Sequence, residues 1–255
     1  MDRELLIAVF VDFENLAIGV RDTGDKEFQV ELVLKRLLEK GRIVYKRAYC
    51  DWSNYRGEVR KFHGHGIQLV DIPQTRVSGK NSADIHMVVD ALDLCYAKSH
   101  IDVFALLSGD SDFSPLVSKL KENQKRVIGC GVKSSTSELL IASCDEFIYY
   151  DDLASSARKQ QRTKKKAPKT KDRKQEALER LAEIMESLEQ DYDKIWGSQV
   201  KQTMRRVYPG FSESHYGYRN FAELLKHGQE TGMISLEYDK SRGNYSVSLR
   251  ESSRV

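Results

Sequence analysis

The sequence predicts an α/β protein: an open, doubly wound parallel sheet, followed by a basic linker and a smaller unit of helices and a hairpin. Up to about Asp152, short β-rich runs alternate with helical ones, as repeated βα units require. Runs such as IAVFVD and VFALLS are apolar on both faces, which is typical of strands that helices cover on both sides. The 255 residues suffice for one full α/β domain and a smaller second one.

The strands of the first domain are predicted from short runs rich in β-branched and aromatic residues. They are expected at Leu5–Val11, Ile43–Tyr49, Ile67–Asp71, Val103–Leu107, Arg126–Gly131 and Glu146–Tyr149. Among the helices between them, one ends at Gly41. Another begins at Ser114-Pro115, an N-cap residue followed by proline at the first helical position.

Residues 154–173 are expected to form a basic, disordered linker between a domain at 1–153 and a domain at 174–252. The stretch RKQQRTKKKAPKTKDRK holds one acidic residue and shows no apolar periodicity. After it, one helical face collects six apolar side chains: Ala177, Leu178, Leu181, Ile184, Met185 and Leu188. Two more helical stretches and a closing hairpin, MISLEYDKSRGNYSVSLR, predict a small winged-helix (α+β) domain.

Composition excludes several classes of protein. The net charge of +3 is too small to indicate a partner by itself, so the distribution of charge has to decide. The apolar run at the start is too short for a signal peptide, and no stretch approaches a membrane span, so a cytoplasmic protein without membrane contact is expected. The four cysteines are scattered without CxxC spacing, which indicates buried free thiols and sets aside a structural zinc site.

Three predicted loops at one edge of the sheet carry aspartates. Asp12 ends the first strand, and Asp110 and Asp112 follow the fourth, in SGDSDF. Ligands of open parallel sheets bind outside the carboxyl ends of the strands, near the switch in strand order. If strands one and four are central neighbours, as in the common 3-2-1-4-5 type of order, these acids converge. Asp84 joins them from the helix after the third strand.

Two interpretations of these aspartates stay open. Each one alone fits an N-cap or turn residue. Together, the four carboxylates would repel one another and push at least one toward protonation, a conflict that a divalent cation removes. Ligation by oxygen alone favours Mg²⁺ or Mn²⁺ over zinc.

Four further residues are candidates for the same site, each with a plainer alternative. Asn15 could orient a carboxylate or position a water, or it could cap the next helix. Lys80 could contact a phosphate, or it could be a solvated loop lysine. Trp52 could stack on a base, or it could pack at the rim. Ser134 opens a Ser-Ser-Thr run before a helix and could hold a phosphate, although simple capping explains it as well.

Three motifs in combination resemble the NYN domain, which has a PIN-like nuclease fold: VFVDFENL, KNSAD and LLSGDSDFSPLV. The likeness extends from Leu5 to Asp152. It implies RNA cleavage that depends on Mg²⁺ or Mn²⁺, with the matching aspartates as metal ligands and Asn15 as a further site residue. The implied catalytic residues are Asp12, Asn15, Asp84, Asp110 and Asp112. The common KG-D form of the family reads KNSAD here, one residue longer, which shifts Lys80 relative to Asp84.

The C-terminal part is similar to the LOTUS domain, also called OST-HTH. The likeness rests on Gly197, Val200, Pro209, Phe211, the YGYRNFAELL core and the closing hairpin. It implies a winged-helix module that binds RNA or a protein partner, of a kind often paired with NYN-type nucleases. Most of the matching residues are apolar, so they identify the fold better than the ligand.

The leading functional hypothesis is therefore a Mg²⁺- or Mn²⁺-dependent ribonuclease, expected to act as an endoribonuclease, with a C-terminal unit that recruits RNA. A non-catalytic RNA-binding or adaptor protein on the same fold is the alternative, and the presence of all four aspartates argues against it. A Toprim-like phosphotransfer enzyme also uses D-x-D after a strand. That fold wants a glutamate at the end of the first strand, where this chain has Asp12.

Overall fold

The structure, a computed structural model, describes residues 4–23, 27–73, 82–164 and 173–250, with the side chains of 159–164 left out. Contacts divide the chain into two compact units. Unit 1 comprises residues 1–37 and 41–163, and unit 2 comprises residues 38–40 and 164–255.

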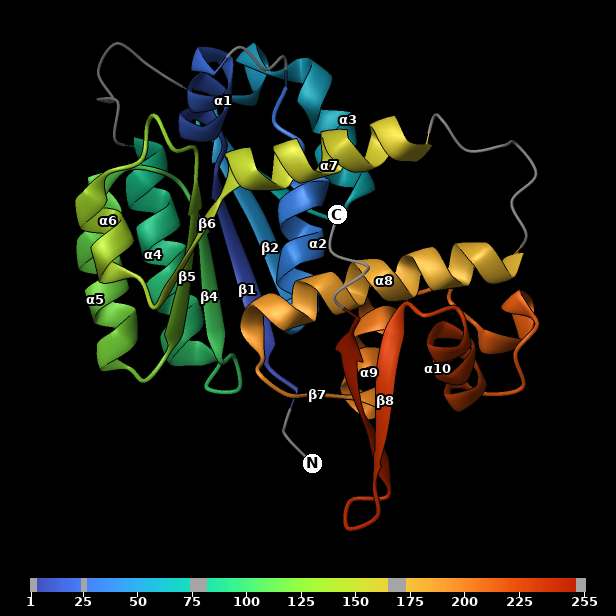
Figure 1. Ribbon diagram of the computed structural model, residues 1–255. Coiled ribbons are helices and arrows are strands. Elements are labelled where there is room, and N and C mark those ends of the chain that lie inside the picture. The colour runs from blue at the N-terminus through green and yellow to red at the C-terminus, as the bar shows by residue number, and fades with distance from the viewer. Residues whose placement is uncertain (1–3, 24–26, 74–81, 165–172, 251–255) are drawn as a thin grey trace. The chain divides into compact units, whose positions relative to one another are not determined.

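Unit 1 is built on a six-stranded sheet in the order β3-β2-β1-β4-β5-β6 (Figure 1). Every pair of neighbouring strands is parallel. The strands are β1 (Leu6–Asp12), β2 (Arg42–Cys50), β3 (Gln68–Asp71), β4 (Val103–Leu107), β5 (Arg126–Gly131) and β6 (Glu146–Tyr149). Each begins and ends within one residue of its predicted run. The predicted order, with strands one and four as central neighbours, is confirmed.

Helices cover both faces of this sheet, which is why its central strands are apolar throughout. Side chains alternate along β1: Ile7, Val9 and Val11 join one buried cluster, while Ala8 and Phe10 join the other. The first cluster packs against α1 (Phe13–Asp22), α2 (Val30–Lys40), α3 (Arg56–Gly64) and α7 (Tyr150–Lys164), and the second against α4 (Ser82–Ala97), α5 (Ser114–Glu122) and α6 (Glu138–Ser143).

One predicted helix boundary is confirmed, and the other is off by one residue. Ser114, predicted as the N-cap, is the first residue of α5. Phe113 takes the N-cap position without a side-chain hydrogen bond, and Pro115 lies in the first turn, where a missing N–H loses no hydrogen bond. The end of α2 is Lys40, and the amide of Gly41 donates to the carbonyl of Leu37 at 3.0 Å. Because the first of these boundaries fixes where the β4–α5 connection stops, it also limits where Asp110 and Asp112 can lie.

The predicted disordered linker at 154–173 is wrong over residues 154–164, which continue helix α7. Tyr150 and Ala154 are buried in the core of unit 1 and anchor the helix start, and Asp151 and Asp152 lie in its first turn. Acidic residues at a helix N-terminus and good helix formers such as Arg, Lys and Gln after them favour a helix without an apolar stripe. The next helix, α8, begins at Arg173, and residues 165–172 lie outside the described ranges.

Unit 2 joins helices to a small antiparallel sheet in the order β7-β9-β8. All six apolar residues predicted for one face of its first helix are buried in a single core. Its elements are α8 (Arg173–Asp191), β7 (Ile195–Trp196), α9 (Gly197–Val207), a 3₁₀ turn η3 (Glu213–Tyr216), α10 (Phe221–Glu230), β8 (Ile234–Asp239) and β9 (Asn244–Leu249).

In the described part of the chain, no helix combines the length and the apolar character that crossing a membrane requires.

Packing in the sheet of unit 1 predicts the effect of a side chain at Gly129. A Cβ atom there would lie 2.4 Å from the ring of Phe147 and 2.9 Å from the sulfur of Cys144. We expect Gly129→Ala to lower the free energy of unfolding by about 1–3 kcal/mol through overpacking, measured by urea denaturation. Gly57→Ala is the matched control, because a Cβ at Gly57 in α3 meets nothing within 4 Å. Equal losses in both variants would contradict the packing explanation.

Candidate active site

Asp12 sits where β1 ends and α1 begins, and its carboxylate faces two elements at once. One oxygen accepts from the backbone N–H of Asn15 at 3.3 Å and so caps α1. The other accepts from the hydroxyl of Ser108, which directly follows β4, at 2.7 Å. Val11 pairs with Leu107 across the two strands, so Asp12 and Ser108 are level at the carboxyl edge of the sheet. Asp12 is 7% exposed. It therefore caps a helix and also lies at the switch in strand order.

Hydrogen bonds between residues two positions apart fold the connection after β4 into a tight turn. The amide of Asp110 donates to the hydroxyl of Ser108 at 3.2 Å. The Asp110 carboxylate in turn accepts from the amide of Asp112 at 2.9 Å and caps the 3₁₀ turn η2 (Ser111–Phe113). Asp110 is partly buried and Asp112 is exposed. A cap uses one oxygen of Asp110, so the second oxygen is the one that could face a ligand.

Asn15 ties the first helix to this connection. Its side-chain carbonyl accepts from the amide of Gly109 at 2.9 Å. Gly109 has to be glycine, because a Cβ there would lie 2.8 Å from the carbonyl oxygen of Ser135 and 3.0 Å from Thr136. Its own carbonyl accepts from the amide of Ser137 at 2.9 Å. The connections after β1, β4 and β5 are thus locked to one another.

Asp84, in the first turn of α4, joins the group electrostatically. Burial raises its pKa to about 6, with further contributions from the negative charges of Asp110, Asp112 and Glu14. Although α4 follows the third strand, its start reaches the carboxyl edge beside β4. The charges of the neighbouring aspartates therefore reach two members of the group: Asp84 and Asp110 act on Asp12, and Asp110 and Asp112 act on Asp84.

Burial likewise raises the pKa of Asp12, to about 7. The hydrogen bonds from Ser108 and Asn15 favour the charged form and oppose this shift, while Asp84 and Asp110 add to it. Without a nearby cation, the site holds more negative charge than its surroundings can neutralise.

Two members of this site were not predicted from the sequence. Glu14, partly buried in the first turn of α1, raises the pKa of Asp84 and, after the larger effect of burial, that of Cys50. Its position two residues after Asp12 is the signal that could have revealed it. Ser108 is fully buried and bonds to Asp12, yet a serine at the end of an apolar run gives no specific sign of this.

The other candidate residues differ in where they lie. Trp52 is 6% exposed: its indole N–H donates to the carbonyl of Val70 at 3.1 Å, and its ring stacks on Phe13. Trp52 is therefore a core residue with little surface for a base, in agreement with the plainer alternative. Ser134 is exposed beside the locked loops, but Ser137 rather than Ser134 caps α6, accepting from the amide of Leu139 at 3.2 Å. Lys80 lies outside the described residues.

No group of three or more His, Cys, Asp or Glu side chains within the described ranges could hold a metal ion as they are arranged. The donor types nevertheless fit Mg²⁺ or Mn²⁺, because all four aspartates offer oxygen only. Binding such an ion would require these side chains to draw closer together.

The sequence pattern of the NYN domain matches residues 6–152, more than half of the chain. This chain belongs to the NYN domain family. The matched region covers the whole six-stranded sheet and ends in the first turn of α7. NYN domains are PIN-like and generally nuclease-like, which suggests a hydrolase.

Two proteins similar to this NYN chain are themselves without an assigned function. An uncharacterized protein of Methanocaldococcus jannaschii is 28% identical over 162 residues, which are 63% of this chain and 61% of that protein. The match thus spans less than two thirds of that relative. A protein of unknown function from Vibrio parahaemolyticus, with a known crystal structure, is 26% identical with a TM-score of 0.53 over 60% of this chain and 97% of the other.

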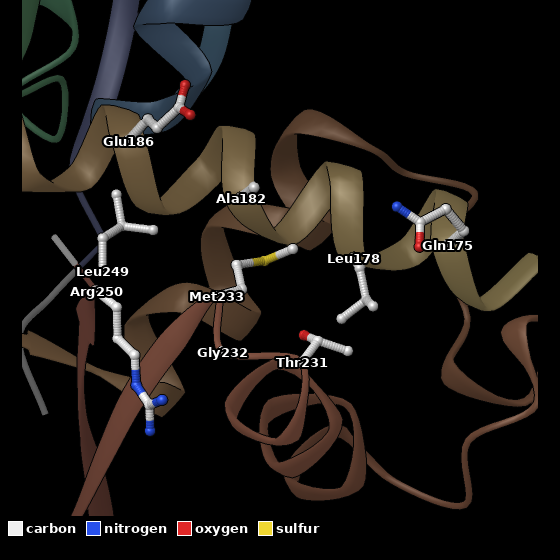
Figure 2. Close-up of a pocket in the computed structure, with 9 residues that line it drawn as sticks. All are labelled: Gln175, Leu178, Ala182, Glu186, Thr231, Gly232, Met233, Leu249 and Arg250. Atoms are coloured by element: carbon white, nitrogen blue, oxygen red, sulfur yellow. The ribbon is translucent and has the colours of Figure 1, made fainter. Parts of the chain in front are cut away.

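A hollow of about 530 Å³ lies in unit 2, between α8, the turn after α10 and the end of β9 (Figure 2). Apolar side chains form much of its wall, with Glu186 and Arg250 among its polar residues. It contains none of the aspartates of the candidate site.

The pKa of Asp12 predicts how stability depends on pH. Because its pKa in the folded chain, about 7, lies above its ordinary 3.8, the folded chain keeps a proton that the unfolded chain loses as the pH rises through this window. In EDTA, the wild type should therefore lose stability between these pH values. Asp12→Asn should flatten the loss and be the more stable protein at pH 8, by on the order of 4 kcal/mol at most. Urea denaturation at several pH values measures this.

Asp145→Asn is the control with the opposite sign. Against the effect of burial, the amide of Val127 and the ammonium of Lys121 hold the pKa of Asp145 below its ordinary value. Removing that charge should destabilise the chain at pH 8. If the free energy of unfolding depends on pH in the same way in the wild type and in Asp12→Asn, the raised pKa of Asp12 is contradicted.

Proposed function

We propose that this NYN protein is a metal-dependent ribonuclease, in which Asp12, Asp84, Asp110 and Asp112 hold Mg²⁺ or Mn²⁺ at the carboxyl edge of the sheet. The observation that carries the proposal is the electrostatic coupling of carboxylates from three separate connections at the switch in strand order. Burial and mutual repulsion raise the pKa values of Asp12 and Asp84. Such a concentration of unneutralised acid in one place is typical of a functional site.

A bound divalent cation would supply a water of lowered pKa and would stabilise negative charge on the phosphate during hydrolysis. The side chains around the site would release a proton to make room for the cation's charge, orient its ligands and donate to the substrate. Asp12, with a pKa of about 7, is partly protonated near neutral pH and would release that proton as the cation binds, whereas Asp84, with a pKa of about 6, is mostly ionised there. The hydrogen bonds from Ser108 and Asn15 keep Asp12 oriented. The side-chain oxygen of Asn15 already accepts from the backbone N–H of Gly109. We therefore assign the side-chain NH₂ group of Asn15 as a donor to a phosphate oxygen or a water.

RNA is the substrate that we propose, with unit 2 as a winged-helix module of LOTUS type that recruits it. The order of helices and strands in unit 2 supports this assignment, since a hairpin follows α8, β7, α9 and α10. Lys194 and Arg242 lie over the ring of Trp196 at 4.8 and 4.7 Å from its centre, which brings positive charge and an aromatic surface together. The basic run between the units would add attraction to phosphates without sequence preference. A protein partner, if one binds, is expected at the same unit.

Asp110→Asn tests catalysis. The substitution keeps the shape of the side chain and an oxygen to accept the Asp112 amide, but removes a ligand charge. We expect cleavage of labelled single-stranded RNA in Mn²⁺ to fall by at least ~100-fold, as losing a key electrostatic group typically does. Glu122→Gln, which removes an exposed charge on α5, should cleave like the wild type. The proposal is contradicted if Asp110→Asn cleaves RNA as fast as the wild type and EDTA does not slow the reaction. RNA binding by the wild type without cleavage would favour the adaptor alternative.

Thermal unfolding tests the metal site separately from activity. A cation that binds only the folded state at a hundredfold excess over its Kd stabilises it by about 2.7 kcal/mol, which raises the Tm by roughly 5–10 °C. We expect this shift for the wild type in Mn²⁺ relative to EDTA, and its loss in an Asp84→Asn/Asp110→Asn double variant. In EDTA, Asp112→Asn should be neutral or mildly stabilising, because it removes repulsion. A wild-type Tm indifferent to Mn²⁺, with Asp112→Asn melting lower, would mean that these aspartates only cap helices.

A further inference from the structure

The outward face of α4 carries a row of large, mostly exposed apolar side chains, at one end of which the hydroxyl of Tyr96 accepts from the side-chain amide of Asn123 at 3.4 Å. Ile85, Val89 and Tyr96 expose 61%, 50% and 64% of their surfaces. Leu92 lies in the same row, because the spacing 85, 89, 92 and 96 keeps to one side of a helix, although part of its side chain packs against the core under α4. Contiguous apolar side chains of this kind mark an interaction surface more often than isolated ones do. The opposite face of α4 is buried against the sheet, so the helix is apolar on both sides.

The spacing of this row is symmetrical. Steps of four, three and four residues read the same from either end of α4. A second α4 running antiparallel would therefore place its own row in register with the first. Ile85 would meet the partner's Tyr96, and Val89 would meet the partner's Leu92. Alternating steps of four and three are also the spacing that packs helices at a shallow crossing angle.

Two polar residues beside the row complement each other in the same arrangement. His86 and Asp93 are exposed and lie seven residues apart, so they share one flank of the row. In an antiparallel pair related by a two-fold axis, equal flanks face each other. In this register, His86 lies about 3 Å along the helix axis from the level of the partner's Asp93, within reach of the two side chains, and the symmetry repeats this contact. An imidazole can donate a hydrogen bond to a carboxylate in either protonation state.

We propose that the outward face of α4 is a dimer interface, occupied by the α4 of a second copy of this chain in antiparallel orientation. A single pair of helices covers less than the roughly 800 Å² per partner of a standard stable interface, so the dimer should form reversibly in the micromolar range. The proposal goes beyond the ribonuclease assignment and does not depend on it, since none of its contacts uses a residue of the candidate site.

The test is sedimentation of the full chain over a wide range of protein concentration. The average mass should rise from the 29.2 kDa of one chain toward twice that value. Val89→Asp should weaken the association at least ~10-fold, because the pair would enclose two unpaired carboxylates. Leu139→Asp is the matched control: Leu139 is 60% exposed on α6 of the same unit and should leave the dimer unchanged. A mass that stays at one chain throughout, or equal effects of the two substitutions, would overturn the proposal.

An exchange of charge tests the antiparallel register and guards against misfolding of a single variant. His86→Asp faces the partner's Asp93 with a like charge and should weaken the dimer. The double variant His86→Asp/Asp93→His restores both contacts with their positions exchanged and should recover wild-type association. Recovery supports the proposed pairing. If the double variant has the circular dichroism spectrum of the wild type but does not regain its association, the dimer does not use this register and the proposed pairing is overturned.

Discussion

Asp12 ends β1, one of the two central strands of a six-stranded parallel sheet, where it is 7% exposed between β2 on one side and β4 on the other. Charging a group buried in this way is costly, and the raised pKa of Asp12 records that cost. The hydroxyl of Ser108 and the amide of Asn15 offset part of it. The rest of the cost of the buried negative charge is removed when Asp12 binds a proton or a cation. Burial therefore destabilises the ionised site and at the same time favours the binding of positive charge.

The connections around Asp12 are held mainly by hydrogen bonds between side chains and backbone amides, which fix the position of the aspartates. Asn15 reaches the amide of Gly109, and Gly109 packs against the loop after β5 so closely that a Cβ would not fit. Three connections, after β1, β4 and β5, therefore behave as one structure. Asp84 is the exception, since it arrives from α4 and is related to the others through charge. Closing of the site around a cation would thus depend mainly on side-chain rotation and on the start of α4.

Helix α4 is under three constraints. Its inward face is buried in the core, its first turn supplies Asp84 to the site, and its outward face carries the exposed row that includes Val89 and Tyr96. A helix that only covered a sheet would be polar on its outer side. The apolar outer side is therefore unexplained by the fold of one chain, whereas self-association would account for it. Unit 2, in contrast, buries its apolar stripe along α8 in its own core.

The sequence by itself determined the strands and the positions of the four aspartates along the chain, whereas the strand order was assumed from the common order of doubly wound sheets and confirmed by the structure. Continuous apolar runs identify strands covered on both faces, and strand ends fix where Asp12 and Asp110 lie along the chain. The prediction of a disordered linker was wrong over residues 154–164, where the sequence lacks an apolar pattern. Helix α7 continues through this basic run because its start is anchored in the core and its residues favour a helix. Only the tertiary structure decided that Trp52 is buried, that Glu14 and Ser108 join the site, and how far the pKa of Asp12 rises. Exposure and ionisation depend on which distant segments pack around a side chain, and spacing along the chain does not contain that information.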